Sequence, residues 1–233
     1  MNAAAVIVAA GKGNRMRGDI RKQYLLLGGR PILWYSLKTF ESCREINHIS
    51  LCIPEQDFDF CRSNILTHLD FPKKIILVPG GAHRQESVYN GMMAIDCDMR
   101  KNGIIVIHDG VRPFIKAGDI TECIKWAASD GACILGIPAT DTLKSVNSRG
   151  CVTKTLSRNR VWMAQTPQAF QCDLIKRAHE KARQKGFTGT DDAQLVELTG
   201  QAVKVIRGSG NNIKITTRQD LVLARALHSI SGI

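Results

Sequence analysis

The sequence predicts an α/β fold in which a mainly parallel, Rossmann-like sheet is flanked by helices. Apolar runs of strand length alternate with segments whose apolar residues recur at helical spacing, over the first 138 residues. Such alternation produces crossover connections, so neighbouring strands run parallel and helices cover both faces of the sheet. Glycine-rich loops follow several of these strands, and ligands bind beyond the carboxyl ends of strands in this architecture.

The expected elements of this first part follow one another along the chain. Pro31 fits the first position of its helix, where a missing N–H costs no hydrogen bond. Strands are expected at 3–8, 49–53, 75–78, 104–107 and 132–137, and helices at 31–43, 56–69, 84–97 and 117–129.

The last third of the chain predicts a second set of elements. We expect a strand over 161–166 that ends at Pro167, a helix over 173–184, and short strands over 203–206 and 213–215. Asp191 and Asp192 fall in the first turn of a helix that Gly200 ends, where carboxylates cap the helix and suit its dipole. We therefore assign them to capping rather than catalysis. The sequence from Thr217 to Asp220 has the form of a capping box before the last helix.

Between these parts, the segment 139–160 has the pattern of a β-hairpin. Two alternating runs, 142–146 and 152–156, flank a turn at 147–150. An isolated hairpin is marginal in water, and this one has too few apolar residues to cover itself. We therefore expect residues 1–233 to form a single domain with 139–160 as a protruding β-arm for homodimerisation; the alternative is a hairpin folded back on its own domain.

Composition excludes several classes of protein. With 233 residues, 44% of them hydrophobic, the chain can bury a full core. It has no long uncharged apolar stretch and no signal-peptide layout, so we expect a cytoplasmic protein that does not bind membranes. Its eight cysteines are scattered without a C-x-x-C pair, which predicts neither a zinc site nor a disulfide framework.

A net charge of +11 raises the hypothesis of a basic nucleic-acid-binding protein. The distribution of the charge argues against it, because the basic residues are spread along the chain and aromatic residues make up only 6%. The one local cluster, around Lys176 to Lys185, fits the solvated face of an amphipathic helix. We therefore expect no nucleic-acid partner, and binding assays at increasing salt concentration would separate the two hypotheses.

The loop after the first strand has the character of a phosphate-binding turn. It contains Gly11 and Gly13, which let backbone N–H groups converge on an anion, and Arg15 and Lys22 add positive charge. It matches neither the G-x-G-x-x-G pattern nor the Walker A pattern. A purely structural turn is the competing interpretation.

Asp109 is the best-placed residue for a divalent metal, since it ends a buried strand and precedes Gly110. An aspartate at a strand end can also be a turn former. His108 is expected to pack or form hydrogen bonds, because no second ligand stands at metal-site spacing. No nucleophile with a paired base is evident, which suits attack by a phosphate on a nucleotide, a reaction that needs alignment and charge neutralisation but no general base.

Taken together, these motifs resemble those of the 2-C-methyl-D-erythritol 4-phosphate cytidylyltransferases of the non-mevalonate isoprenoid pathway. The resemblance is ordered and covers nearly the whole chain. It rests on Ala9-Ala10-Gly11-x-Gly13-x-Arg15-Met16, Lys22-Gln23-Tyr24, Gly80-Gly81-x-x-Arg84-x-x-Ser87-Val88, His108-Asp109-x-x-Arg112-Pro113, Asp141-Thr142, Gln165-Thr166-Pro167-Gln168 and Asn212-Ile213-Lys214-Ile215-Thr216.

The resemblance implies Mg2+-dependent transfer of CMP from CTP to 2-C-methyl-D-erythritol 4-phosphate, with release of pyrophosphate. It also implies roles for particular residues. The catalytic residues would be Arg15, Lys22 and Lys214; the nucleotide-binding residues Ala9, Ala10, Gly11, Lys12, Gly13, Gly81, Ser87 and Gly110; and the substrate-binding residues Asp109, Thr142, Lys144 and Arg158, with Asp109 holding Mg2+. Thr142, Lys144 and Arg158 lie on or beside the 139–160 arm and would reach the partner subunit's site.

Ribitol-5-phosphate cytidylyltransferase is the close alternative, because it shares the fold, the nucleotide and much of the motif set. Those enzymes typically have paired glycines in the first loop, whereas Ala9-Ala10-Gly11 stands here, and Arg158-Asn159 with Trp162 also favour the methylerythritol enzymes. The chain departs from the family at Ala82-His83 and at Gly210, where an acidic residue is usual.

Overall fold

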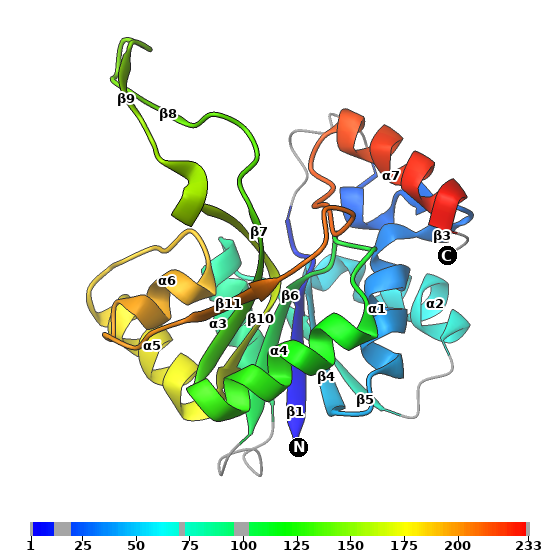
Figure 1. Cartoon of the computed structure of the whole chain (residues 1–233). Helices are drawn as coiled ribbons and strands as arrows, with labels where there is room; N and C mark the ends of the chain where they lie inside the picture. The colour runs from blue at the N-terminus through cyan, green and yellow to red at the C-terminus, as the bar shows by residue number, and fades with distance from the viewer. Residues whose placement is uncertain (1, 12–19, 70–72, 96–102, 232–233) are drawn as a thin grey trace.

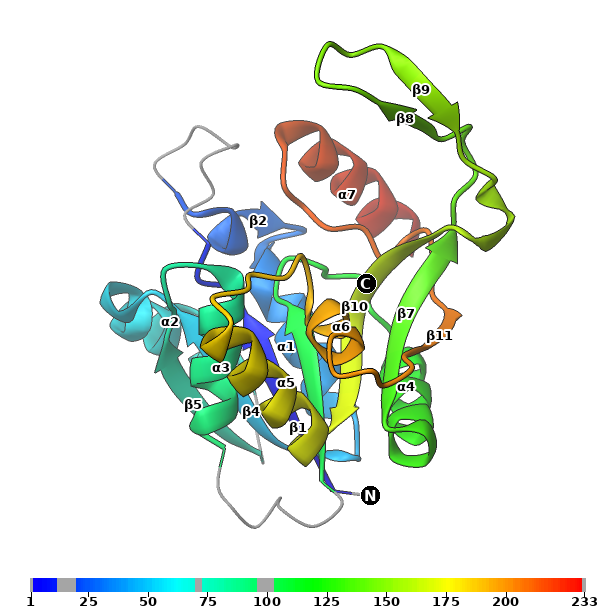
Figure 2. The ribbon, with the colours of Figure 1, turned by 90° about the vertical axis from the view of Figure 1, so that its left-hand side faces the viewer.

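The computed structural model describes residues 2–11, 20–69, 73–95 and 103–231. Its centre is a seven-stranded sheet with the order β11-β7-β10-β6-β1-β4-β5, as Figures 1 and 2 show. The strands are β1 (Ala3–Val8), β4 (Ile46–Ile53), β5 (Lys74–Pro79), β6 (Ile104–Asp109), β7 (Ala132–Pro138), β10 (Trp162–Gln171) and β11 (Lys204–Arg207). In this sheet β10 runs antiparallel to both β6 and β7, and the other pairings are parallel, so the predicted mainly parallel sheet is confirmed.

Helices cover both faces of this sheet. The helices are α1 (Ile32–Ser42), α2 (Phe58–Asn64), α3 (Arg84–Met93), α4 (Ala117–Asp130), α5 (Cys172–Gln184), α6 (Asp192–Glu197) and α7 (Arg218–Ser231). Side chains of β1 alternate between two cores: Ala3, Ala5 and Ile7 join the core under α1, α2 and α4. Ala4 and Val6 join the core under α3, α5 and α6. Because both faces are covered, β1 is an unbroken apolar run.

A smaller apolar cluster attaches α7 to the body. It joins Ala224 of α7 to Leu27 and Tyr35, next to the short antiparallel pair of β2 (Leu26–Leu27) and β3 (Arg30–Pro31). The predicted capping box opens α7: Thr217 N–H donates to Asp220 Oδ2 at 2.8 Å, and Asp220 N–H donates to Thr217 Oγ1 at 3.2 Å. Four short 3-10 helices complete the described elements: η2 (Lys22–Tyr24), η3 (Glu55–Asp57), η4 (Leu66–His68) and η6 (Arg158–Arg160).

The expected hairpin is formed by β8 (Lys144–Val146) and β9 (Val152–Thr155), which pair antiparallel. The side chain of Asn147 closes its turn by accepting the N–H groups of Arg149 and Cys151, both at 3.0 Å. All seven residues of the two strands are exposed, and in Figures 1 and 2 the hairpin lies away from the sheet. No described helix is both long and apolar enough to cross a membrane.

Three predicted elements differ from the structure. The strand expected to end at Pro167 continues to Gln171, with a shift in its register with β7 between Ala164 and Gln168. The strand expected at 213–215 is absent; that segment is irregular, although Ile215 N–H donates to Val111 O at 3.0 Å. The helix expected at 56–69 is broken into η3, α2 and η4.

Most of the described cysteines belong to the core. Six of them are buried and unpaired, and Cys151 in the hairpin is exposed. Cys97 lies outside the described residues.

Candidate active site

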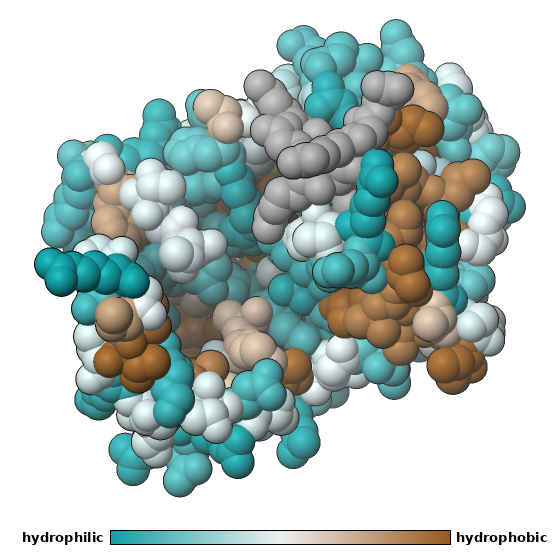
Figure 3. Space-filling model, turned by 90° about the horizontal axis from the view of Figure 1, so that it is seen from above, coloured by the Kyte–Doolittle hydropathy of each residue, from teal (hydrophilic) through white to brown (hydrophobic). Residues whose placement is uncertain are grey.

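A cavity of about 440 Å³ opens at the carboxyl ends of β1, β5 and β6, the place that the fold class predicts for a ligand. Figure 3 looks down on this end of the molecule, where hydrophilic side chains dominate and hydrophobic ones gather over α7. The described residues that line the cavity come from three loops and a later segment: Val8, Ala9, Ala10, Gly11, Lys22, Gln23, Gly81, Ala82, His83, Arg84, Ser87, Asp109, Val111 and Lys214.

The first loop is held against its neighbours by backbone contacts. Ala9 N–H donates to Cys52 O at 2.8 Å, and the buried Gln23 side chain donates to Ala9 O at 2.6 Å. A Cβ on Gly80 would lie 2.1 Å from the Cβ of Ala10, so only glycine lets the second loop approach this closely. The predicted residues Lys12, Gly13 and Arg15 lie outside the described residues.

Lys22 is placed at the cavity by the short helix η2. Two contacts to Asp57 fix this helix: Tyr24 OH donates to Asp57 Oδ2 at 3.1 Å, and Arg21 Nε lies 2.9 Å from the same oxygen. Burial and the nearby Asp57 carboxylate raise the pKa of the Tyr24 hydroxyl above its ordinary value, so Tyr24 stays neutral and donates. The residues beside Lys22 therefore serve to hold its backbone.

The second loop brings Gly81 and Ser87 together. Ser87 Oγ accepts the Gly81 N–H at 3.0 Å and donates to His83 O at 3.2 Å, which ties the loop to the first turn of α3. At the position where the family usually carries an acid, Ala82 donates its N–H to the Glu86 carboxylate at 2.7 Å. A carboxylate from the following helix thus lies near the position that lacks one.

Asp109 sits at the centre of the positive charge in this site. Its side chain is 8% exposed, and it contacts Arg84 Nε at 2.9 Å and Lys214 Nζ at 2.8 Å, with Arg112 Nε 3.9 Å away. Burial alone would raise the pKa of this carboxyl, but Arg84 and Lys214 outweigh burial and hold the pKa far below its ordinary value. Asp109 is therefore ionised at physiological pH.

The donor set fits a metal that arrives with a polyphosphate. No group of three or more His, Cys, Asp or Glu side chains occurs among the described residues, and Asp109 is the only carboxylate among those lining the cavity. Mg2+ sites in phosphate-transferring enzymes use one or two carboxylates, with substrate oxygens and water completing the shell. The residues present suit that arrangement, but not an all-protein metal site.

His108 has the packing and hydrogen-bonding role expected of it. Its ring is fully buried, with Nδ1 3.1 Å from Thr166 Oγ1 and Nε2 3.3 Å from Arg112 O. Burial lowers the pKa of the imidazole to about 3, so the ring is neutral at physiological pH. It holds the Asp109 loop against β10 and does not carry charge.

Comparison with known proteins shows which family has this arrangement. The family model described as "IspD: 2-C-methyl-D-erythritol 4-phosphate cytidylyltransferase" matches residues 3–229. This chain belongs to that cytidylyltransferase family. Its members are nucleotidyltransferases, a class of enzyme that generally uses a divalent metal.

Curated relatives and solved structures agree over nearly the whole chain. A 2-C-methyl-D-erythritol 4-phosphate cytidylyltransferase of Pelotomaculum thermopropionicum is 44% identical over 96% of this chain and 93% of its own length. One of Syntrophotalea carbinolica is 44% identical over 100% and 98%. The crystal structure of the 4-diphosphocytidyl-2C-methyl-D-erythritol synthase of Anaerococcus prevotii superposes with a TM-score of 0.85 at 35% identity, covering 98% of this chain and 96% of that one.

Not every residue that the cytidylyltransferase resemblance suggested lies at the cavity. Gly110 packs beneath it, where a Cβ would come within 2.8 Å of Leu33 Cδ1, and its N–H donates to Val8 O. Thr142, Lys144 and Arg158 are not among the residues that line their own chain's cavity. Lys144 Nζ donates to Thr155 Oγ1 at 2.8 Å, and Arg158 donates to Thr140 O.

Sequence reasoning missed two residues in this cytidylyltransferase site. Arg84 lines the cavity and contacts Asp109. It belongs to one of the motifs that carry the family resemblance, but the resemblance implied no role for it. Asp192, assigned to helix capping, is instead 1% exposed and paired with Arg84 at 2.7 Å, while Asp191 caps α6 by accepting Gln194 N–H at 3.0 Å. Position at a helix N-terminus explains both aspartates locally, so no sequence signal separates them.

Proposed function

We propose that this chain transfers CMP from CTP to 2-C-methyl-D-erythritol 4-phosphate, giving 4-diphosphocytidyl-2-C-methyl-D-erythritol and pyrophosphate in the non-mevalonate isoprenoid pathway. The observation that carries the proposal is the convergence of Lys22, Lys214 and Asp109 on one cavity in a chain that belongs to the family named for this reaction. Family members are named for the acceptor, and the cavity supplies the charges that a triphosphate needs.

In this reaction a phosphate oxygen of the acceptor attacks the α-phosphorus of CTP, and the bond from that phosphorus to the bridging oxygen of the β-phosphate breaks. The attacking phosphate is already anionic, so alignment and charge neutralisation carry the catalysis. Lys22 and Lys214 would neutralise the charge that builds up around the α-phosphate, and Arg15 would do the same from the first loop. Backbone groups from Ala9 to Gly13 would surround the triphosphate.

We assign the divalent metal to Asp109 and propose that it is Mg2+, which would neutralise phosphate charge when bound. The ionised, buried carboxylate of Asp109 supports this assignment, because a hard cation prefers such an oxygen ligand. Gly81 and Ser87 would contact the cytidine, since the second loop borders the same cavity.

We further propose a cytoplasmic homodimer in which the 139–160 arm reaches the partner subunit. Its strands are exposed, and Val146, Val152, Trp162 and Met163 on or beside it are between 41% and 60% exposed. Apolar groups in such numbers on a thin hairpin suit an interface. Thr142, Lys144 and Arg158 would then bind the methylerythritol phosphate in the partner's cavity, since they do not line their own.

Pyrophosphate release from CTP and Mg2+ tests the function, with 2-C-methyl-D-erythritol 4-phosphate and D-ribitol 5-phosphate compared as acceptors. We expect release with the first acceptor only. Release with the second only would keep the fold and chemistry but assign the chain to the ribitol enzymes. Release with neither, together with tight and salt-sensitive binding to DNA or RNA, would favour the nucleic-acid-binding hypothesis.

A further inference from the structure

A row of paired side chains, formed by His179, Asp192 and Arg84, leads from the core of the molecule to Asp109. His179 Nε2 lies 3.2 Å from Asp192 Oδ1, and Asp192 Oδ2 lies 2.7 Å from Arg84 Nη1. Arg84 Nε in turn lies 2.9 Å from Asp109 Oδ1. We propose that His179 and Asp192 are positioning residues, which fix the Asp109 carboxylate through Arg84 and so set the affinity of the site for the metal–CTP complex.

The inner end of this row of side chains is buried. His179 is 0% exposed and Asp192 1% exposed, so the pair lies where an uncompensated charge would be costly. Burial would raise the pKa of the Asp192 carboxyl, but Arg84 and His179 outweigh burial and hold the pKa below its ordinary value. An ionised carboxylate can only accept hydrogen bonds, so His179 Nε2 carries the hydrogen and donates it to Asp192.

The backbone around Asp192 makes it a fixed anchor. The N–H groups of Asp192 and Ala193 both donate to Gln168 Oε1 at 3.2 Å, which joins the start of α6 to β10. Arg84 extends from the first turn of α3 and is therefore held between this anchor and Asp109. A planar guanidinium that bonds through two different nitrogens has a defined orientation, which a single contact would not give it.

Loss of the anchor would change what Arg84 does to Asp109. Arg84 Nη2 is buried without a hydrogen-bond partner in the described part of the chain, and the Arg84 charge is compensated by ion pairs with Asp192 and Asp109. If Asp192 lost its charge, Asp109 would be the remaining anion of the two. The whole positive charge would then be directed at Asp109, where it competes with a cation. Residues that orient a metal ligand from behind typically contribute about 10- to 100-fold in metal affinity or activity.

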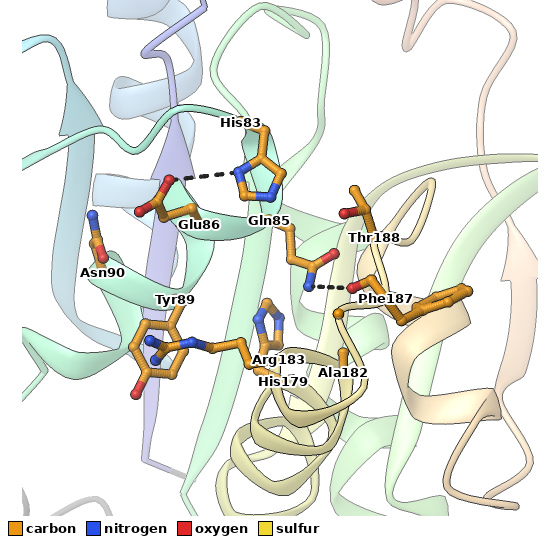
Figure 4. A pocket seen from close by; sticks show the side chains of 11 residues that line it. His83, Gln85, Glu86, Tyr89, Asn90, His179, Ala182, Arg183, Phe187 and Thr188 are labelled. Carbon is orange, nitrogen blue, oxygen red and sulfur yellow. Dashed lines mark hydrogen bonds and ion pairs between the residues drawn. The ribbon is translucent and has the colours of Figure 1, made fainter.

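A cavity beside His179 leaves room for substitutions at this end of the row of side chains. The cavity has a volume of about 300 Å³ and is lined by Tyr89, Gln85 and Arg183 among others, and Figure 4 shows how these side chains lie. The Arg183 guanidinium stacks 4.2 Å from the centre of the Tyr89 ring. The centre of the His179 ring lies 6.4 Å from that of the Tyr89 ring. Within the described residues, His179 Nδ1 has no hydrogen-bond partner, so a substitution at His179 removes the donor to Asp192 without breaking another hydrogen bond of the ring.

Asp191 provides a matched control, since it is the neighbouring carboxylate at the start of α6 and contacts Gln168 and Gln194 rather than Arg84. We compare Asp192→Asn with Asp191→Asn, because asparagine keeps the size of aspartate in both and remains a good N-cap in place of Asp191. The readouts are binding of Mn2+ in the presence of CTP, measured by electron paramagnetic resonance, and kcat and KM for both substrates. Thermal unfolding confirms that each variant is folded.

We expect Asp192→Asn to weaken Mn2+ binding and lower kcat about 10-fold or more, and Asp191→Asn to change either by less than about 2-fold. Equal effects of the two substitutions would overturn the proposal. If Asp192→Asn does not fold, His179→Leu and His179→Gln decide: the first removes the donor to Asp192 and should weaken Mn2+ binding, and the second retains a donor and should restore it. Equal Mn2+ binding in these two variants would also overturn the proposal.

The proposal rests on the proposed function, but its failure is distinguishable from failure of that function. Mn2+ binding with CTP is measured without any acceptor, so it does not depend on which acceptor the enzyme uses. If the unmodified enzyme releases pyrophosphate with neither acceptor while Asp192→Asn still weakens Mn2+ binding, the reaction is misassigned and the positioning role stands.

Discussion

The proposed function places Lys22 and Asp109 where negative charge develops, so their loss should reduce turnover more than binding. We expect Lys22→Ala and Asp109→Ala each to lower kcat by about 100- to 1,000-fold, the range for removal of one group that stabilises a developing charge. The KM for CTP should change much less. Steady-state pyrophosphate release measures both, and Lys38→Ala, a surface residue paired with Glu41 on α1, is the control. Near-normal turnover in either variant would remove that residue from the catalytic set.

His108 should make stability depend on pH. Its pKa is lowered from 6.5 to about 3 in the folded protein, whereas the unfolded chain takes up the proton near pH 6.5. The unfolded state therefore binds more protons between these values, and stability falls as the pH decreases from 6.5 toward 3, by about 5 kcal/mol in total. The contribution is fully present above pH 6.5.

Urea unfolding at pH 7, 5.5 and 4.5 measures this effect, with His108→Gln as the comparison because glutamine keeps a donor and an acceptor but does not titrate. The variant should lose less stability across this range than the unmodified chain. Asp109 and Asp192 do not interfere, since their lowered pKa values stabilise the fold above the ordinary aspartate range and matter only below about pH 4. Parallel pH curves for the two proteins would contradict the assignment.

Local motifs were sufficient to predict part of the site at residue scale. Ala10, Gly81 and Asp109 line one cavity because each ends a strand or follows one closely, which the sequence pattern indicates. Lys22 lies on η2 and Lys214 in an irregular segment, and both were indicated by the motifs that carry the family resemblance. The Arg84–Asp192 pair could not be predicted in this way, since its partners are 108 residues apart and meet only in the folded chain. A pairing between distant elements has no periodicity to reveal it.

At the scale of elements, the turn that joins β2 to β3 contacts α7. This turn contains two adjacent glycines whose substitutions can be compared. Gly28 and Gly29 both have positive φ, at 54° and 86°. A Cβ on Gly28 would lie 2.1 Å from the His228 ring of α7, whereas one on Gly29 would meet nothing within 4 Å. His228 Nε2 is itself 3.1 Å from Tyr35 OH, which donates to Leu27 O, so the ring cannot move without loss.

We therefore expect Gly29→Ala to cost only backbone strain, about 1 kcal/mol, and Gly28→Ala to cost about 2–4 kcal/mol because overpacking adds to the strain. Chemical denaturation of the two variants measures the difference in the free energy of unfolding. If the two substitutions cost the same, α7 is not held against this turn through His228.

Elements with strong periodicity were predicted well. Elements that depend on contacts with distant segments of the same chain were not. β1 was predicted with its observed bounds because it is buried on both faces and bounded by a turn. Pro167 was taken to end a strand because proline donates no N–H, yet β10 continues past it to Gln171, with a shift in its register with β7 between Ala164 and Gln168. Residues 213–215 have strand composition but make no ladder, since Val111 offers only one hydrogen bond.

For the molecule as a whole, the sheet order explains why the cavity is assembled from distant segments. β1 lies between β6 and β4, and β5 follows β4, so the loops that leave β1, β5 and β6 meet at one edge. The 139–160 hairpin branches off between β7 and β10, on the other side of β6. Its basic side chains Lys144 and Arg158 do not line the cavity of their own chain, and the proposed homodimer would let them reach the cavity of the partner.

A mixing experiment tests this arrangement in the assembled enzyme. Arg158→Ala should raise the KM for the acceptor far more than that for CTP, and Lys22→Ala should abolish turnover. If Arg158 acts in the partner subunit's cavity, a heterodimer of the two variants contains one site with both residues intact and one with neither. Random mixing after reversible dissociation should then restore about a quarter of the wild-type activity, since about half of the dimers are heterodimers with one working site.

If Arg158 instead served the cavity of its own chain, every site would carry one substitution and mixing would restore nothing. Sedimentation before and after mixing establishes that dimers form and exchange, so that a negative result reports on the site rather than on assembly. Deletion of 144–155 separates the two roles of the hairpin further. A monomer that still binds CTP but no longer uses the acceptor at low concentration would place both the interface and the acceptor contacts on the hairpin.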